Sequence, residues 1–111
     1  MKEPLASRQC VPCRGGVPTL TLREAEELRR DTPEWTLARD AKRLVRRFEF
    51  ADFRSAIDFV NRVADVAEEQ GHHPDIAIHW NVVELVLWTH KIDGLHENDF
   101  ILAAKIDELL A

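Results

Sequence analysis

Apolar residues recur at three- and four-residue spacing through the middle of the chain, a pattern that predicts an amphipathic helix. The repeating positions are Phe53, Ala56, Ile57, Val60, Val63, Ala64 and Ala67. Asp52 precedes them as a helix N-cap, and Gly71 follows where a left-handed stop is expected. The helix should therefore end directly before the stretch "GHHPD", residues 71–75.

Two shorter helices are predicted on either side of this segment. Thr21 and Glu24 have the spacing of a capping box. Pro33 disfavours helical backbone in the residue before it, so the first helix should end near Asp31. The last helix should occupy residues 96–110, where the apolar positions are Phe100, Ala103, Ile106, Leu109 and Leu110.

Four short strands fill the remaining segments. Residues 35–50 predict two strands joined by a turn at residues 39–41, while "DIAIHW" (75–80) and "VVELVLWTH" (82–90) predict two more. The resulting order is helix-strand-strand-helix-strand-strand-helix. It predicts an α+β fold, in which a four-stranded antiparallel sheet carries helices packed on one face. We expect a single domain over residues 19–111.

Residues 1–18 predict an extended N-terminal arm, because they hold three prolines, two glycines and no apolar periodicity. We expect this arm to be mobile unless it binds metal, and dispensable for catalysis. Its "CVPC" motif, Cys10 to Cys13, is half of a zinc ribbon and needs two further ligands. Zinc shared between two chains, a redox pair and a structural remnant are the alternatives.

Composition excludes several classes of protein. The 111 residues carry a net charge of −5, which argues against a general nucleic-acid binder. The basic residues between Arg39 and Arg47 alternate with apolar ones and indicate the solvent side of a strand. The chain has no apolar run of membrane-spanning length and no export signal, so we expect a cytoplasmic protein without membrane contact.

All five histidines fall between positions 72 and 96. His72 and His73 follow the long helix and His90 ends a strand, and such element ends are where small folds place their sites. His79 and His96 are expected to be surface or structurally satisfied residues. The spacing is poor for a metal chelate, whereas imidazoles that titrate near neutrality suit acid–base catalysis.

Seven residues at fixed spacings give the chain a resemblance to a known family. They are Glu68, His72, His73, Pro74, Trp80, His90 and Asp99. This pattern resembles the signature of pterin-4α-carbinolamine dehydratase. The segments 35–74 and 87–107 are also similar to that family, especially to its bacterial and plastid-type members, and the likeness extends over roughly residues 20–110.

The resemblance implies a reaction and a set of partners. A 4a-hydroxytetrahydrobiopterin loses water to give quinonoid dihydropterin, as part of tetrahydrobiopterin recycling. No cofactor and no metal is implied. A homodimer or homotetramer is implied. The apolar run at residues 82–88 separately predicts an exposed strand edge that would pair with another copy.

The resemblance also implies roles for particular residues. His72 and His90 would form the acid–base pair, and His73 would bind and orient the pterin and share in proton transfer. The remaining residues with implied roles are Gly71, Trp80, Thr89 and Lys91 as pterin contacts, and Glu68 and Asp99 as carboxylates that hold a histidine tautomer. Two positions depart from the family pattern: Gly71 stands where animal members have aspartate, and Asn98 where arginine is common.

Two other functions stay open on the sequence. The family includes non-enzymatic relatives that act as a transcription coactivator or resemble RuBisCO assembly factors, so the chain could be a protein-interaction module. A zinc-binding protein that uses Cys10 and Cys13 is the other alternative. The three histidines favour the enzyme, because an interaction module has no chemical need for them.

Overall fold

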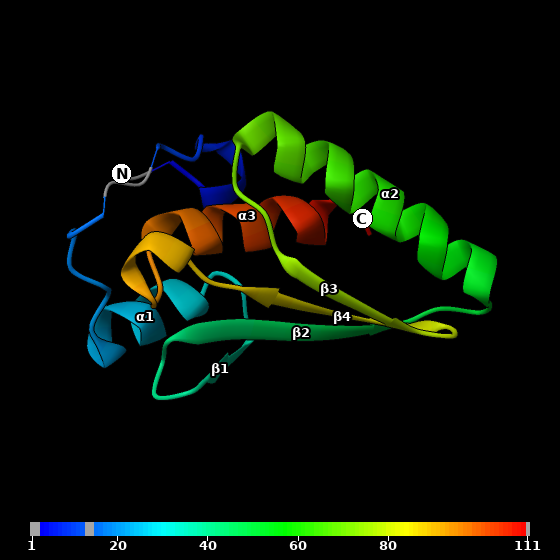
Figure 1. Ribbon diagram of the computed structural model, residues 1–111, viewed down its shortest axis with the longest axis horizontal. Coiled ribbons are helices and arrows are strands. Elements are labelled where there is room, and N and C mark those ends of the chain that lie inside the picture. The colour runs from blue at the N-terminus through cyan, green and yellow to red at the C-terminus, as the bar shows by residue number, and fades with distance from the viewer. Residues whose placement is uncertain (1–2, 13–14, 111) are drawn as a thin grey trace.

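The computed structural model describes residues 3–12 and 15–110. Four strands form one antiparallel sheet in the order β1-β2-β4-β3 (Figure 1). The elements are η1 (Leu5–Ser7), α1 (Leu22–Arg29), β1 (Thr36–Ala38), β2 (Arg43–Glu49), α2 (Phe53–Gln70), β3 (Asp75–His79), β4 (Val82–Leu87), η2 (His90–Ile92) and α3 (Glu97–Glu108). The predicted α+β fold and its element order are confirmed. No helix in these ranges is both long and apolar enough to cross a bilayer.

Local signals set the ends of the helices as predicted. Thr21 and Glu24 form a reciprocal capping box at the start of α1. The Asp52 side chain accepts a hydrogen bond from the Ser55 N–H at the start of α2, and Gly71 ends that helix with φ 64°. Because glycine adopts positive φ without steric cost, the chain can turn sharply there and enter β3.

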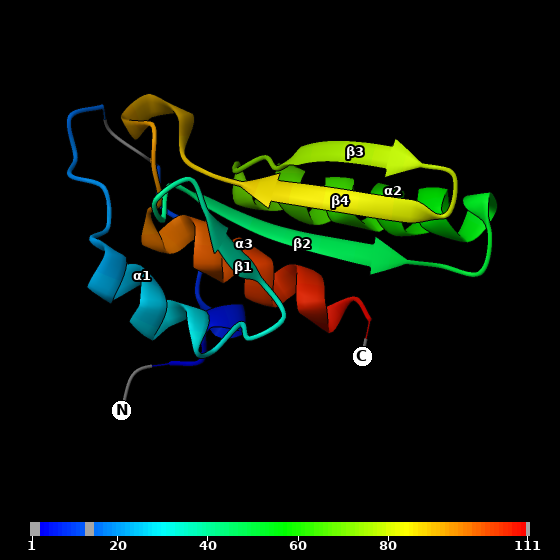
Figure 2. The same ribbon diagram turned by 90° about the horizontal axis from the view of Figure 1, so that it is seen from below.

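The core lies between the sheet and two helices, α2 and α3, which cover the same face (Figure 2). Alternate strand residues point into it because successive side chains face opposite sides of a sheet. On β4 these are Val83, Leu85 and Leu87, which pack against Phe59 and Phe100 on the helices and are all almost fully buried. This packing holds the C-terminal end of α2 near the start of α3.

The apolar run at residues 82–88 is not an edge strand, and this prediction is wrong. β4 pairs with β2 on one side and with β3 on the other, so its backbone groups are used inside the sheet. The outer strands are β1 and β3. The run is apolar because β4 is central, and a sequence pattern alone does not distinguish a central strand from an exposed one.

The N-terminal arm is not a free extension over the residues that the structure describes. Leu5 in η1 is 4% exposed and belongs to the hydrophobic core. Arg8 forms an ion pair with Glu97, and the Lys105 ammonium donates to the Ala6 carbonyl. Apolar and charged side chains therefore pack residues 3–12 on α3, where the sequence alone predicted an extended, mobile arm.

Candidate active site

The exit of α2 and the end of β4 form a pocket of about 390 Å³ that contains three histidines. Its lining residues are Val11, Pro12, Gly71, His72, His73, Trp88, Thr89, His90, Lys91 and Asn98. A volume of this size suits a small organic ligand. The lining includes all three histidines that the sequence singled out, His72, His73 and His90.

His72 is the most enclosed of the three and contacts a buried carboxylate. Its Nε2 lies 2.5 Å from Oδ1 of Asp99, which is fully buried. The other carboxylate oxygen of Asp99 accepts hydrogen bonds from the Thr89 hydroxyl and from the His96 N–H. Asp99 is therefore fixed by three partners and can hold one proton position on the His72 ring.

His73 lies at the mouth of the pocket and has a carboxylate partner of its own. Its Nε2 is 2.5 Å from Oε2 of Glu68, one turn back on α2. Both side chains are more than half exposed to solvent, at 60% and 77%. His73 can therefore change orientation more easily than His72.

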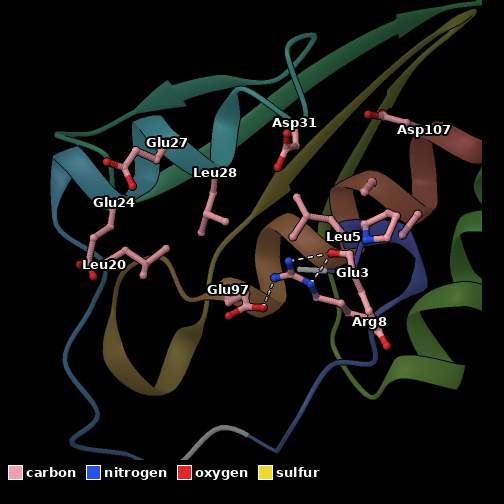
Figure 3. Close-up of a pocket in the computed structure, with 13 residues that line it drawn as sticks. Glu3, Leu5, Arg8, Leu20, Glu24, Glu27, Leu28, Asp31, Glu97 and Asp107 are labelled. Carbon is pink, nitrogen blue, oxygen red and sulfur yellow. Dashed lines mark hydrogen bonds and ion pairs between the residues drawn. The ribbon is translucent and has the colours of Figure 1, made fainter. Parts of the chain in front are cut away.

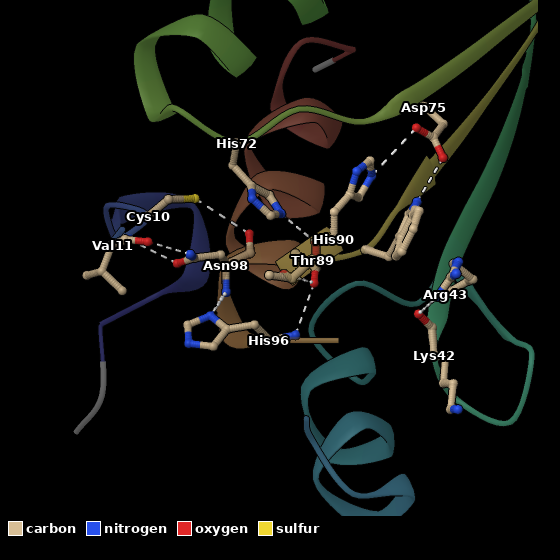
Figure 4. A network of polar contacts seen from close by, with 12 residues as sticks. Cys10, Val11, Lys42, Arg43, His72, Asp75, Thr89, His90, His96 and Asn98 are labelled. Atoms are coloured by element: carbon tan, nitrogen blue, oxygen red, sulfur yellow. Dashed lines mark hydrogen bonds and ion pairs between the residues drawn. The ribbon is translucent and has the colours of Figure 1, made fainter. Parts of the chain in front are cut away.

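His90 stacks on an aromatic ring that the sequence prediction left out of the site. The ring centroids of Trp88 and His90 are 3.8 Å apart. The Arg43 guanidinium lies over the Trp88 ring, 3.6 Å from its centroid. Asp75 accepts a hydrogen bond from Trp88 Nε1 and lies 3.8 Å from Nε2 of His90 (Figure 4). Trp88 and His90 are two positions apart, so in a strand their side chains lie on the same face. This spacing was the sequence signal that could have added Trp88 to the site.

Each of the three histidines thus faces its own carboxylate: Asp99, Glu68 or Asp75. Such a partner holds the orientation of the imidazole ring and selects its tautomer. An array of this kind can deliver a proton to a bound molecule and accept another from it.

The other predicted contact residues divide into two groups. Gly71, Thr89 and Lys91 line the pocket. Trp80 does not: it occupies the turn between β3 and β4, at the opposite end of β3 from Asp75. The structure therefore does not bring Trp80 to the histidines within one chain, because the β3–β4 hairpin carries it away from them.

Sequence reasoning missed five residues at or beside the pocket. They are Val11, Pro12, Asp75, Trp88 and Asn98. The two arm residues gave no sequence signal, since only the packing of residues 3–12 on α3 brings them to the pocket. His96, which was expected to be a surface or structurally satisfied residue, caps α3: its Nδ1 accepts a hydrogen bond from the Asn98 N–H.

Residues 3–12 and 15–110 contain no group of three His, Cys, Asp or Glu side chains placed to hold a metal ion. Cys13 lies outside these residues, so the zinc and redox readings of "CVPC" stay predictions. Cys10 is half-buried, and burial together with the Asp99 carboxylate raises the pKa of its thiol to about 11.

A larger cavity, of about 780 Å³, lies between η1, α1 and α3 (Figure 3). Its lining contains six carboxylates and one arginine, and it shares no lining residue with the histidine pocket. Its lining contains no imidazole.

The fold and the pocket together define a small α+β protein with a pocket in which three histidines lie beside carboxylates. The family model described as "Pterin 4 alpha carbinolamine dehydratase" matches residues 18–109. The chain belongs to this family. The matched range excludes most of the N-terminal arm.

Relatives named "Putative pterin-4-alpha-carbinolamine dehydratase" are about half identical to the chain. The protein of Rubrobacter xylanophilus is 54% identical over 105 residues, which are 95% of this chain and 97% of the relative. That of Methylococcus capsulatus is 51% identical over 107 residues, which are 96% and 94% of the two chains. The likeness therefore covers nearly the whole of both proteins.

Two solved structures resemble this fold. A transcriptional coactivator/pterin dehydratase from Brucella melitensis is 31% identical, with a TM-score of 0.79 over 85% of this chain and 100% of that one. A pterin dehydratase-like protein, identified as a RuBisCO assembly factor in the alpha-carboxysome, is 27% identical, with a TM-score of 0.60 over 68% and 88%.

Proposed function

We propose that the chain removes water from a 4a-hydroxytetrahydropterin to give quinonoid dihydropterin, by histidine acid–base catalysis. The observation that carries this proposal is the pocket in which His72, His73 and His90 each face a carboxylate. Membership of the pterin carbinolamine dehydratase family supports the substrate class.

The proposed chemistry is a dehydration without a change of oxidation state. An imidazolium protonates the hydroxyl oxygen on C4a, and the C4a–O bond breaks as its electron pair leaves with water. The lone pair of N5 forms the C4a=N5 double bond, and a second imidazole accepts the proton released from the nitrogen. Each positioned acid or base contributes about 10²–10⁴-fold to the rate.

We assign the two proton transfers to His72 and His90, with a share for His73. Asp99 fixes the His72 ring from behind, and Trp88 supports the His90 ring by stacking. His73 would orient the pterin at the mouth of the pocket, where it is the more mobile ring. Gly71, Thr89 and Lys91 would contact the pterin, while Trp80 is left out of the proposed site because it lies at the far end of the hairpin.

The test is the rate of pterin dehydration by the purified protein with chelator present. Replacing His72 or His90 by alanine should lower turnover about 10²-fold or more. The double variant should lose less than the product of the two, because groups that act as one unit are not additive. His79→Ala is the matched control, since His79 is exposed on β3 and distant from the pocket. Parental turnover in both single variants would place the chemistry elsewhere.

A protein-interaction role is the second candidate function. Trp80 is 69% exposed and has φ 54°, a conformation that a bulky residue rarely adopts. A large aromatic side chain held outward on a turn is typical of a contact surface. If Trp80→Ser abolishes binding of a partner protein but leaves pterin turnover unchanged, the interaction role is separate from catalysis. If the parental protein has no pterin turnover, the interaction role is favoured over the enzyme.

A further inference from the structure

Residues 9–12 of the N-terminal arm run along one side of the histidine pocket. Val11 and Pro12 are part of its lining, together with His72 and His73, which follow the end of α2, and His90 in η2. These residues precede the range shared with the family model, which begins at residue 18. The arm therefore adds a wall to a pocket that the rest of the domain builds.

Asn98 fixes this wall by two hydrogen bonds to a single residue. Its Oδ1 accepts from the Val11 N–H at 2.9 Å, and its Nδ2 donates to the Val11 carbonyl at 2.6 Å. The side chain thus pairs with the arm as a neighbouring strand would. Asn98 is 2% exposed, so breaking the pair would leave a buried amide without its partners (Figure 4).

Gln70 holds the arm at a second point, outside the pocket lining. Its Oε1 accepts from the Cys10 N–H at 2.8 Å, and its Nε2 donates to the Gln9 side chain at 2.9 Å. Gln70 is the last residue of α2, so the helix that delivers the histidines also fixes the wall.

The wall offers a bound molecule few hydrogen-bonding groups. Both backbone polar groups of Val11 are used by Asn98, and Pro12 has no N–H, so the Pro12 carbonyl is the remaining backbone polar group of the wall. The Val11 side chain is 56% exposed, which is apolar surface that a bound molecule can cover. The wall therefore suits carbon atoms of a ligand better than its hydrogen-bonding edge.

A reduced pterin has one edge rich in hydrogen-bonding groups and one edge that presents carbon atoms. The pyrimidine edge carries amide and amino groups, and these require polar partners. The reduced ring presents carbon at C6 and C7 and bears its substituent on C6. We propose that Val11 and Pro12, held by Asn98 and Gln70, form a specificity wall that contacts the C6–C7 edge and the first carbon of the C6 substituent. This proposal rests on the proposed function of the same site.

Val11→Ser, Asn98→Ala and Gln70→Ala test the wall in three independent ways. Each should raise the KM and the Kd for a 6-methyl pterin about tenfold, the usual worth of a methyl group in an apolar pocket. An unsubstituted pterin should be affected less, and kcat should stay near the parental value because the histidines are unchanged. Val11→Ser removes an exposed side chain, so its result does not depend on the stability of the fold.

Lys105→Ala is the matched control. Lys105 also binds the arm, but at the Ala6 carbonyl and away from the pocket lining. It should leave KM and Kd unchanged. In a Cys13→Ser background, alkylation of Cys10 should be faster in Asn98→Ala and Gln70→Ala than in the parent, because release of the arm exposes that half-buried thiol.

Binding of a non-reactive dihydropterin, followed by calorimetry, separates the two levels of the proposal. If the parental protein binds no pterin, the proposed function is wrong and the wall has no ligand. If the parent binds pterins and the three variants bind them equally well, only the wall is wrong. A loss of kcat for every pterin in Asn98→Ala alone would also overturn it, since Asn98 would then act through Asp99.

Discussion

The Asp99 carboxylate lies 2.5 Å from Nε2 of His72, although 27 positions separate the two residues along the chain. His72 follows the end of α2, and Asp99 lies in the first turn of α3. The same carboxylate accepts the His96 N–H and so closes the capping box of α3. One buried side chain therefore fixes both the start of a helix and the orientation of the most enclosed histidine.

Asp99→Asn should lower kcat while leaving KM close to the parental value. The amide has nearly the same shape, but it can donate as well as accept a hydrogen bond, so it no longer fixes the tautomer of His72 as the carboxylate does. We expect a loss of at least about tenfold, up to the 10²–10⁴-fold share of an acid–base group. Steady-state kinetics on pterin measures it, with Asp58→Asn on the exposed face of α2 as the control. An unchanged kcat would show that His72 needs no carboxylate.

Leu5→Ala should destabilise the protein although Leu5 belongs to the N-terminal arm. Its side chain is 4% exposed within the core, and truncating a buried leucine costs about 2–5 kcal/mol. Leu22→Ala is the control, because Leu22 is 57% exposed and its truncation should change stability by less than about 0.5 kcal/mol. Urea unfolding compares them. Equal midpoints for the two variants would mean that the arm adds nothing to stability.

Asp52→Ala should destabilise the fold near neutral pH and much less in acid. The Ser55 N–H that donates to the Asp52 carboxylate lowers the pKa of this group below its ordinary value. Its contribution is thus fully present above the ordinary aspartate range and is lost as pH falls through the lowered pKa. Thermal midpoints of the variant and the parent should differ at pH 7 and converge at strongly acid pH. A constant difference at all pH values would contradict this.

We predict that the chain forms a homodimer or a homotetramer, and that the copies associate through the outer edge of β3. That strand pairs with β4 on one side, and its other edge has no partner strand among residues 3–12 and 15–110. Ile76 on β3 is 40% exposed and adds apolar surface to this edge. Unpaired edges of this kind favour association.

Light scattering at micromolar concentration should give a dimer or a larger assembly, and Ile76→Lys should shift the mass towards the monomer. Leu22→Lys, which adds the same charge on α1, should not. A parental protein that is monomeric under these conditions would refute the prediction.

The sequence by itself determined the three α-helices and four strands and their order, together with the start of α1 and both ends of α2. The capping box of Thr21 and Glu24, the N-cap at Asp52 and the left-handed Gly71 all form as predicted. These features depend on hydrogen bonds and steric limits within about four residues, so the local sequence contains all the information that they need. The position of His72 and His73, directly after the end of α2, follows from the same local rules.

Only the tertiary structure decided which elements lie side by side. The order β1-β2-β4-β3 puts β4 inside the sheet, brings Asp75 to Trp88 and His90, and carries Trp80 away from them. The tertiary structure also packs Leu5 into the core and places Val11 at the pocket. Apolar periodicity identifies the face of an element that is buried but not the neighbour that covers it. That choice depends on packing the whole core at once, because each buried side chain contacts residues far away in the chain.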